Sequence, residues 1–124
     1  MTEYFADTYY YLAVLNPADA AHRQACSLGS RILGRVVTTV WVVQEIADGL
    51  SHPPSRAIAL RFLTYLDNDP LTTLIEPDRE LWREGVTLYR SRPDKAWSLT
   101  DCISFVVMQQ RGIKEALTAD HHFE

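Results

Sequence analysis

The sequence of 124 residues lacks the motifs that mark several large enzyme classes. It contains no His-x-x-x-His pair, Gly-x-Ser-x-Gly, P-loop or Gly-x-Gly-x-x-Gly, which argues against zinc proteases, α/β-hydrolases and nucleotide-binding folds. No apolar run approaches the roughly 20 residues of a membrane span. The first residues also lack the basic start and small-residue cleavage site of a signal peptide. We therefore expect a cytoplasmic protein with no membrane association.

Cysteine is scarce, and the charge balance is only mildly acidic. Cys26 and Cys102 form no Cys-x-x-Cys motif, so we expect two reduced thiols on helices, with a disulfide between them as the alternative. The net charge of −4 argues weakly against a nucleic-acid binder. Acids that bind a divalent cation must be discounted, however: removing four of the 16 acids leaves 12, against 12 basic residues. Net charge therefore does not decide between these classes.

Hydrophobic residues (47%) and charged residues (23%) occur in ordinary globular proportions, and apolar runs alternate with breaks. We predict strands at 3–7, 36–38, 71–75 and 116–119, and helices at 8–15, 18–33, 38–50, 55–66, 76–91 and from 98 to the glycine at 112. Candidate helix caps are Thr38 or Thr39, Ser98 or Thr100, and Gly34 at the end of the second helix. This alternation predicts one α/β domain with a mostly parallel sheet of about four strands, flanked by helices on both faces.

Four acids lie near the ends of these elements, and each has an ordinary structural interpretation. Asp7 follows the first strand and suits a helix N-cap, and Asp101 is a favourable charge in the first turn of a helix. Glu45 would be a solvated acid on a helix surface. Asp120 would be a turn residue after the last strand.

The combination of the four acids favours a metal site. In a parallel α/β fold, these positions converge on the edge formed by the carboxyl ends of the strands. Carboxylates held that close repel one another, and a divalent cation removes the penalty. Mg²⁺ and Mn²⁺ prefer oxygen ligands, and the natural chemistry is metal-assisted hydrolysis of a phosphodiester bond.

Four short stretches carry a family resemblance. They are Asp7-Thr8, Val43-Gln44-Glu45-Ile46-Ala47, Thr100-Asp101-Cys102-Ile103-Ser104-Phe105 and Thr118-Ala119-Asp120-His121-His122-Phe123. Taken together, in this order and spacing, they resemble the PIN-domain ribonucleases, most closely the VapC-type toxins of bacterial toxin–antitoxin pairs. The resemblance spans the whole chain, so we expect a single three-layer PIN-like domain over residues 1–124.

The resemblance implies an endoribonuclease that depends on Mg²⁺ or Mn²⁺ and acts as a toxin. It also implies a small antitoxin partner and a homodimer. The implied metal-binding and catalytic acids are Asp7, Glu45, Asp101 and Asp120, with the hydroxyls of Thr8, Thr100 and Ser104 orienting them. The alternative is a PIN fold that binds RNA or a protein without cutting. A flap-type DNA nuclease is disfavoured because the chain lacks the extra segments of such folds.

Two departures from the family pattern stand out. Family members usually continue past Asp-x-x-Phe into a final strand, which we expect to be absent here. Tyr9, Tyr10 and Tyr11 follow Asp7 where smaller residues are usual. Three tyrosines on one helix cannot all face the core, so we expect one or two to line a cleft or an interface.

The remaining candidates flank the acids. Arg90, Arg92 and Lys95 lie in the loop before Asp101 and are candidate contacts to RNA phosphates, with a solvated loop as the alternative. We expect Trp97 to cover the core, with base stacking as the alternative. His121 and His122, next to Asp120, would be loop residues, or alternatively would bind a softer metal or carry a proton.

Overall fold

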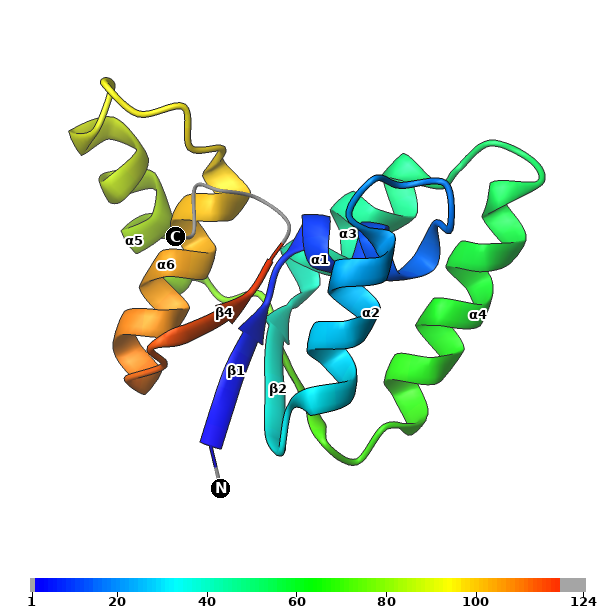
Figure 1. Cartoon of the computed structure of the whole chain (residues 1–124). Helices are drawn as coiled ribbons and strands as arrows, with labels where there is room; N and C mark the ends of the chain where they lie inside the picture. The colour runs from blue at the N-terminus through cyan, green and yellow to red at the C-terminus, as the bar shows by residue number, and fades with distance from the viewer. Residues whose placement is uncertain (1, 119–124) are drawn as a thin grey trace.

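The computed structural model describes residues 2–118, in which strands and helices alternate as the sequence predicts (Figure 1). The elements are β1 (Thr2–Ala6), α1 (Thr8–Leu15), α2 (His22–Arg31), β2 (Gly34–Thr39), α3 (Val40–Gly49), α4 (Ser55–Asn68), β3 (Thr72–Ile75), α5 (Arg79–Ser91), α6 (Leu99–Arg111) and β4 (Glu115–Leu117). The predicted order of elements and the α/β class are confirmed.

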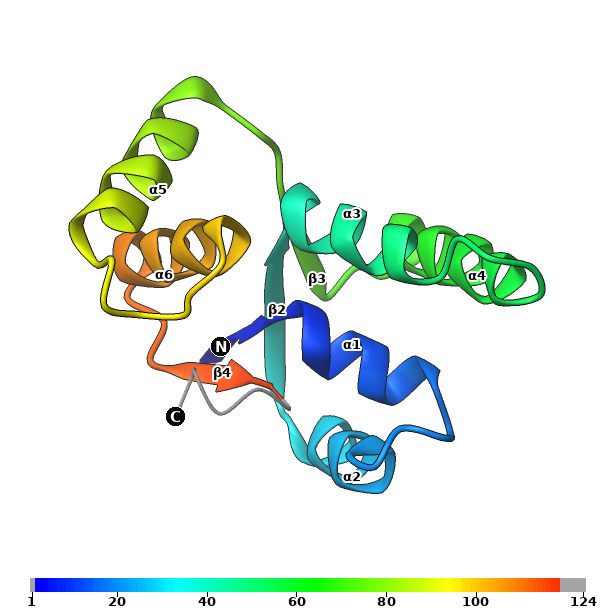
Figure 2. The same cartoon turned by 90° about the horizontal axis from the view of Figure 1, so that it is seen from above.

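The four strands of the described part form one parallel sheet in the order β3-β2-β1-β4. Helices α5 and α6 lie on one face of the sheet, and α1 to α4 lie on the other (Figures 1 and 2). Right-handed crossovers require this division. The chain moves toward one edge of the sheet from β1 to β2 and from β2 to β3, but it moves toward the other edge from β3 to β4, so the helices of the last connection lie on the opposite face. The predicted three-layer arrangement is therefore confirmed.

The second helix and the glycine after it differ from the prediction. Helix α2 begins at His22 rather than at residue 18, because the side chains of Asn16 and Asp19 accept hydrogen bonds from the backbone of residues 18 and 21 and hold turns there. Gly34 is not a helix cap but the first residue of β2. A Cβ at this position would lie 2.1 Å from the carbonyl oxygen of Thr2, so the close approach of β1 and β2 excludes a side chain there.

The other open helix caps are settled. Thr39, not Thr38, caps α3 by accepting a hydrogen bond from the backbone N–H of Val42. Ser98, not Thr100, caps α6. Gly112 ends α6 with a φ of 65°, the left-handed conformation that favours glycine at a helix C-terminus.

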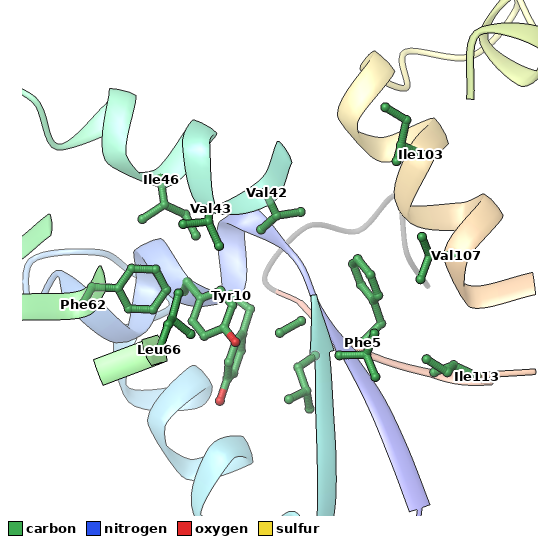
Figure 3. Packing of buried hydrophobic residues seen from close by; sticks show 14 of the residues in the cluster. Phe5, Tyr10, Val42, Val43, Ile46, Phe62, Leu66, Ile103, Val107 and Ile113 are labelled. Atoms are coloured by element: carbon green, nitrogen blue, oxygen red, sulfur yellow. The ribbon is translucent and has the colours of Figure 1, made fainter. Parts of the chain in front are cut away.

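The hydrophobic core lies on both faces of the sheet (Figure 3). Ile103 and Val107 of α6 pack with Phe5 on one side, and α1, α3 and α4 form the other side. Tyr10 and Tyr11 are buried there, whereas Tyr9 is 53% exposed. Burial raises the pKa of both buried phenols above the ordinary value, so they stay neutral at physiological pH.

Two further expectations concern membranes and cysteines. Within residues 2–118 no helix has both the length and the apolar character to cross a membrane. Cys26 is exposed, Cys102 is buried, and both are free thiols, as expected.

Candidate metal centre at the carboxyl edge of the sheet

Asp7 lies where β1 ends and α1 begins, and its side chain is held from two directions. The carboxylate is only 2% exposed. Its Oδ1 accepts a hydrogen bond of 2.8 Å from the backbone N–H of Tyr10, which makes Asp7 the N-cap of α1. Its Oδ2 accepts a hydrogen bond of 2.5 Å from the hydroxyl of Thr118, directly after β4. The neighbouring strand therefore helps to fix this carboxylate at the sheet edge.

Glu45 is connected to the same edge through Thr8. The Thr8 hydroxyl donates a hydrogen bond of 2.6 Å to Oε1 of Glu45, across from α1 to α3. Thr8 is buried and follows Asp7 in the chain, while Glu45 is half-buried. Glu45 is therefore not the freely solvated surface acid of the ordinary interpretation, because a buried hydroxyl next to Asp7 holds it.

Asp101 lies in the first turn of α6. It completes a capping box in which its Oδ2 accepts from the backbone N–H of Ser98, and the Ser98 hydroxyl accepts from the backbone N–H of Asp101, each at 3.0 Å. Burial raises the pKa of the neighbouring Cys102 thiol, and the negative charge of Asp101 raises it further. That cysteine is therefore a neutral packing residue and not a competing thiolate ligand.

The described acids lie toward one end of the molecule, but they do not form a cluster. The carboxyl ends of β1 and β4 and the start of α6 lie at the same end of the molecule (Figure 1). Glu45 is held by Thr8, the residue that follows Asp7, and Asp7 is held by Thr118. Within residues 2–118, no three His, Cys, Asp or Glu side chains lie close enough together to hold a metal ion. Asp120, His121 and His122 lie outside the described residues.

The donor set nevertheless fits a hard divalent cation. Asp7, Glu45 and Asp101 offer only carboxylate oxygens, and the groups around them are hydroxyls and backbone amides. A ligand set of this chemistry suits Mg²⁺ or Mn²⁺ better than zinc or copper. With Asp120, the sequence supplies one more carboxylate three residues after the end of β4, the strand that pairs with β1.

The three hydroxyls predicted to orient the acids behave differently. Thr8 does so directly, through Glu45. The hydroxyl of Ser104 donates a hydrogen bond of 3.0 Å to the backbone carbonyl of Thr100, within α6, and not to one of the acids. Ser104 is fully buried and Thr100 is half-buried.

Two threonines near this edge of the sheet were not among the predicted residues. Thr118 donates to Asp7, and Thr38, fully buried in β2, donates to the backbone carbonyl of Ala6 at 2.8 Å. Both lie near the carboxyl ends of strands adjacent to β1. The sequence could have indicated both, because each is a threonine near the end of a predicted strand, and these strands are predicted to lie next to the strand that ends at Asp7.

The basic loop between α5 and α6 is exposed, with one internal ion pair. Arg92 binds both oxygens of Asp94 at 3.0 Å. This guanidinium lowers the pKa of Asp94 to about 2, so the carboxylate is charged at neutral pH. Trp97 is half-buried and stacks edge-on against Phe105, with 4.9 Å between ring centroids. Trp97 does not belong to the main hydrophobic cluster of the described residues, so the expectation that it covers the core is not met.

The strand order and the division of the helices between the two faces of the sheet define a three-layer α/β domain (Figure 2). The PIN domain family model matches residues 4–124, and the chain belongs to this family.

Among solved structures, the chain is similar to the Mycobacterium tuberculosis VapC20 toxin, which cleaves the sarcin–ricin loop. The TM-score is 0.89 at 23% sequence identity, over 96% of this chain and 91% of that one. A search of curated proteins finds no match. The likeness to VapC20 establishes a shared fold.

Proposed function

We propose that the protein is a divalent-metal-dependent endoribonuclease. Asp7, Glu45, Asp101 and Asp120 would hold Mg²⁺ or Mn²⁺ at the carboxyl edge of the sheet. Such an ion lowers the pKa of a bound water and stabilises charge on the leaving oxygen of a phosphodiester. The observation that carries the proposal is the Thr8–Glu45 hydrogen bond. Thr8 directly follows Asp7, so this bond holds Glu45 of α3 near Asp7.

The protein contributes positioning rather than a nucleophile of its own. Asp7 is buried and fixed by the N-terminus of α1 and by Thr118, so its orientation is set before any metal binds. The Asp101 carboxylate is fixed against the backbone of Ser98. Preorganised carboxylates need little rearrangement to bind a cation, and the membership of the PIN family supports the same chemistry.

The experiment is cleavage of single-stranded RNA by the purified chain with Mn²⁺, compared among Asp7→Asn, Glu45→Gln and Asp101→Asn. We expect each substitution to abolish cleavage while the thermal unfolding transition remains cooperative. Asp48→Asn is the matched control, because Asp48 lies on α3 beside Glu45 but is exposed, and it should cleave normally. Cleavage that survives the Asp7 and Asp101 substitutions contradicts this mechanism. RNA binding with no cleavage in any divalent metal ion would instead favour a non-catalytic module.

We further propose that this nuclease is a toxin controlled by a small antitoxin protein, with the chain acting as a homodimer. The shared fold with a VapC toxin supports this role. A groove of about 590 Å³ between α1 and α4, lined by Tyr10, Tyr11 and Phe62 among others, offers an apolar surface for a protein partner. Expression of the chain should arrest growth, and co-expression of the product of a small neighbouring gene should relieve the arrest. Absence of arrest would favour a free-standing nuclease.

A further inference from the structure

A second cavity lies at the loop that connects α5 to α6. It has a volume of about 570 Å³ and is lined by Arg90 in the last turn of α5 and by residues of the loop, including Lys95, Trp97 and Ser98. Ser98 lines the cavity and also exchanges two hydrogen bonds with Asp101. The cavity therefore directly adjoins one of the proposed metal-binding acids.

The Trp97 ring is the centre of a cationic cluster. The guanidinium carbon of Arg92 lies 5.3 Å from the ring centroid, and Nζ of Lys95 lies 5.6 Å from it. Phe105 supports the indole from the side of α6. Trp97 lines the cavity and is braced by a second aromatic ring, so its indole is a rigid platform at the cavity wall.

The charge of the loop is opposite to that of the chain. From Arg90 to Ser98 there are three basic residues and one acid, a balance of 3 − 1 = +2, whereas the whole chain carries −4. Arg92 is neutralised by Asp94, with which it forms a two-point ion pair. The surplus positive charge is therefore that of Arg90 and Lys95.

We propose that this cavity is a subsite for one unpaired nucleotide of an RNA substrate, in which Trp97 stacks the base while Arg90 and Lys95 contact the flanking phosphates. A nucleotide is the ligand that needs both an aromatic platform and adjacent cations. The inference rests on the proposed ribonuclease function and adds to it where the substrate is held beside the metal-binding acids.

The test measures equilibrium binding of a short fluorescent single-stranded RNA to the full chain in EDTA, where cleavage cannot occur. We expect Trp97→Leu to weaken binding by about 5- to 150-fold, the usual effect of losing one stacked base. Trp97→Phe should recover part of the affinity because it keeps a π-face. The matched control is Trp82→Leu, since Trp82 is an exposed tryptophan of α5 outside the cavity. Equal losses in the Trp97 and Trp82 variants contradict the proposal.

The double substitution of Arg90 and Lys95 by Gln tests the phosphate contacts without touching a packed side chain. It should reduce the slope of log affinity against log salt by about 1.4, because each contact to a single strand contributes about 0.7. The double substitution of Arg83 and Lys114 by Gln removes the same net charge from exposed positions outside the cavity, and it should leave the slope unchanged. An unchanged slope in the Arg90/Lys95 variant overturns the assignment.

Failure of this inference and failure of the proposed function give different results. If the chain cleaves RNA through Asp7 and Asp101 but the Trp97 variants bind RNA like the wild type, the subsite is wrong and the nuclease remains. If no RNA is cleaved but Trp97 and the two cations are needed for binding, the subsite remains and the nuclease is wrong. In the cleavage assay, loss of the subsite should raise KM and leave kcat unchanged, as expected for binding energy shared by ground and transition states.

Discussion

The substitution Thr8→Val tests whether the bond from Thr8 holds Glu45 for metal binding. Valine keeps the shape of threonine but removes the hydroxyl that donates to Oε1 of Glu45 at 2.6 Å. Removing a group that orients a ligand typically costs 10- to 100-fold in metal affinity or activity, so we expect the Mn²⁺ concentration for half-maximal cleavage to rise by about 10- to 100-fold. Most of the activity should return at saturating Mn²⁺, because the carboxylate itself is still present.

The cost in stability should be smaller than the full value of a charged hydrogen bond. Such bonds contribute about 1.5–3 kcal/mol, but Glu45 is half-exposed, and water replaces part of the lost interaction. We therefore expect a loss of about 1 kcal/mol, which lowers Tm by about 4 °C for a chain of this size. The measurement is a thermal unfolding curve recorded beside the metal titration.

Thr38→Val is the matched control for this experiment. Thr38 is also buried and also donates a hydrogen bond, but to the backbone carbonyl of Ala6 at 2.8 Å. Its loss should cost about 1 kcal/mol of stability through one hydrogen bond, with no shift in the Mn²⁺ titration. The reasoning is refuted if Thr8→Val titrates like the wild type, or if both variants shift by the same amount.

Three substitutions test the packing that positions α6. Gly85→Ala places a Cβ 2.4 Å from Cγ1 of Ile103, whose side chain is fully buried, so thermal unfolding should show a loss of about 1–3 kcal/mol. Adding Ile103→Ala to that variant should cost less than the same substitution in the wild type, because it removes Cγ1, the atom that the added Cβ meets; additive losses in the double-mutant cycle would show that the two positions do not interact. Gly112→Ala should cost about 1–2 kcal/mol from its left-handed backbone alone, since no atom lies within 4 Å of the added Cβ, and an unchanged denaturation midpoint would contradict this.

The fold could be predicted from the sequence because its signals are local. Apolar runs, a proline after Asn16 and a glycine after Arg111 mark the ends of elements that the structure confirms. The error at Gly34 has a cause that is distant in the sequence. Gly34 suits a helix C-terminus as well as a strand, and only the approach of the Thr2 carbonyl, which is distant in sequence, makes glycine necessary in β2.

The candidate site was predictable only in its acids. The positions of Asp7 and Asp101 at element ends follow from the order of strands and helices. The hydroxyl contacts do not, because each depends on side chains from different elements: Thr118 lies 111 residues from Asp7, and Thr8 lies 37 residues from Glu45. Such pairs are set by strand register and helix packing, which a single sequence does not specify. The metal-binding role of all four acids remains a prediction.

Asp7 and Asp101 can cap a helix and bind a metal ion at the same time. A carboxylate has two oxygens and about four sites that accept hydrogen bonds or bind a cation, so a helix cap occupies only part of it. In Asp7, one oxygen caps α1 and the other accepts from Thr118; in Asp101, Oδ2 accepts from the backbone of Ser98. The caps fix where the remaining lone pairs point, at the N-termini of helices whose dipoles favour negative charge. A cap of this kind keeps a carboxylate oriented, and a ligand that is oriented before the cation arrives needs little rearrangement to bind it.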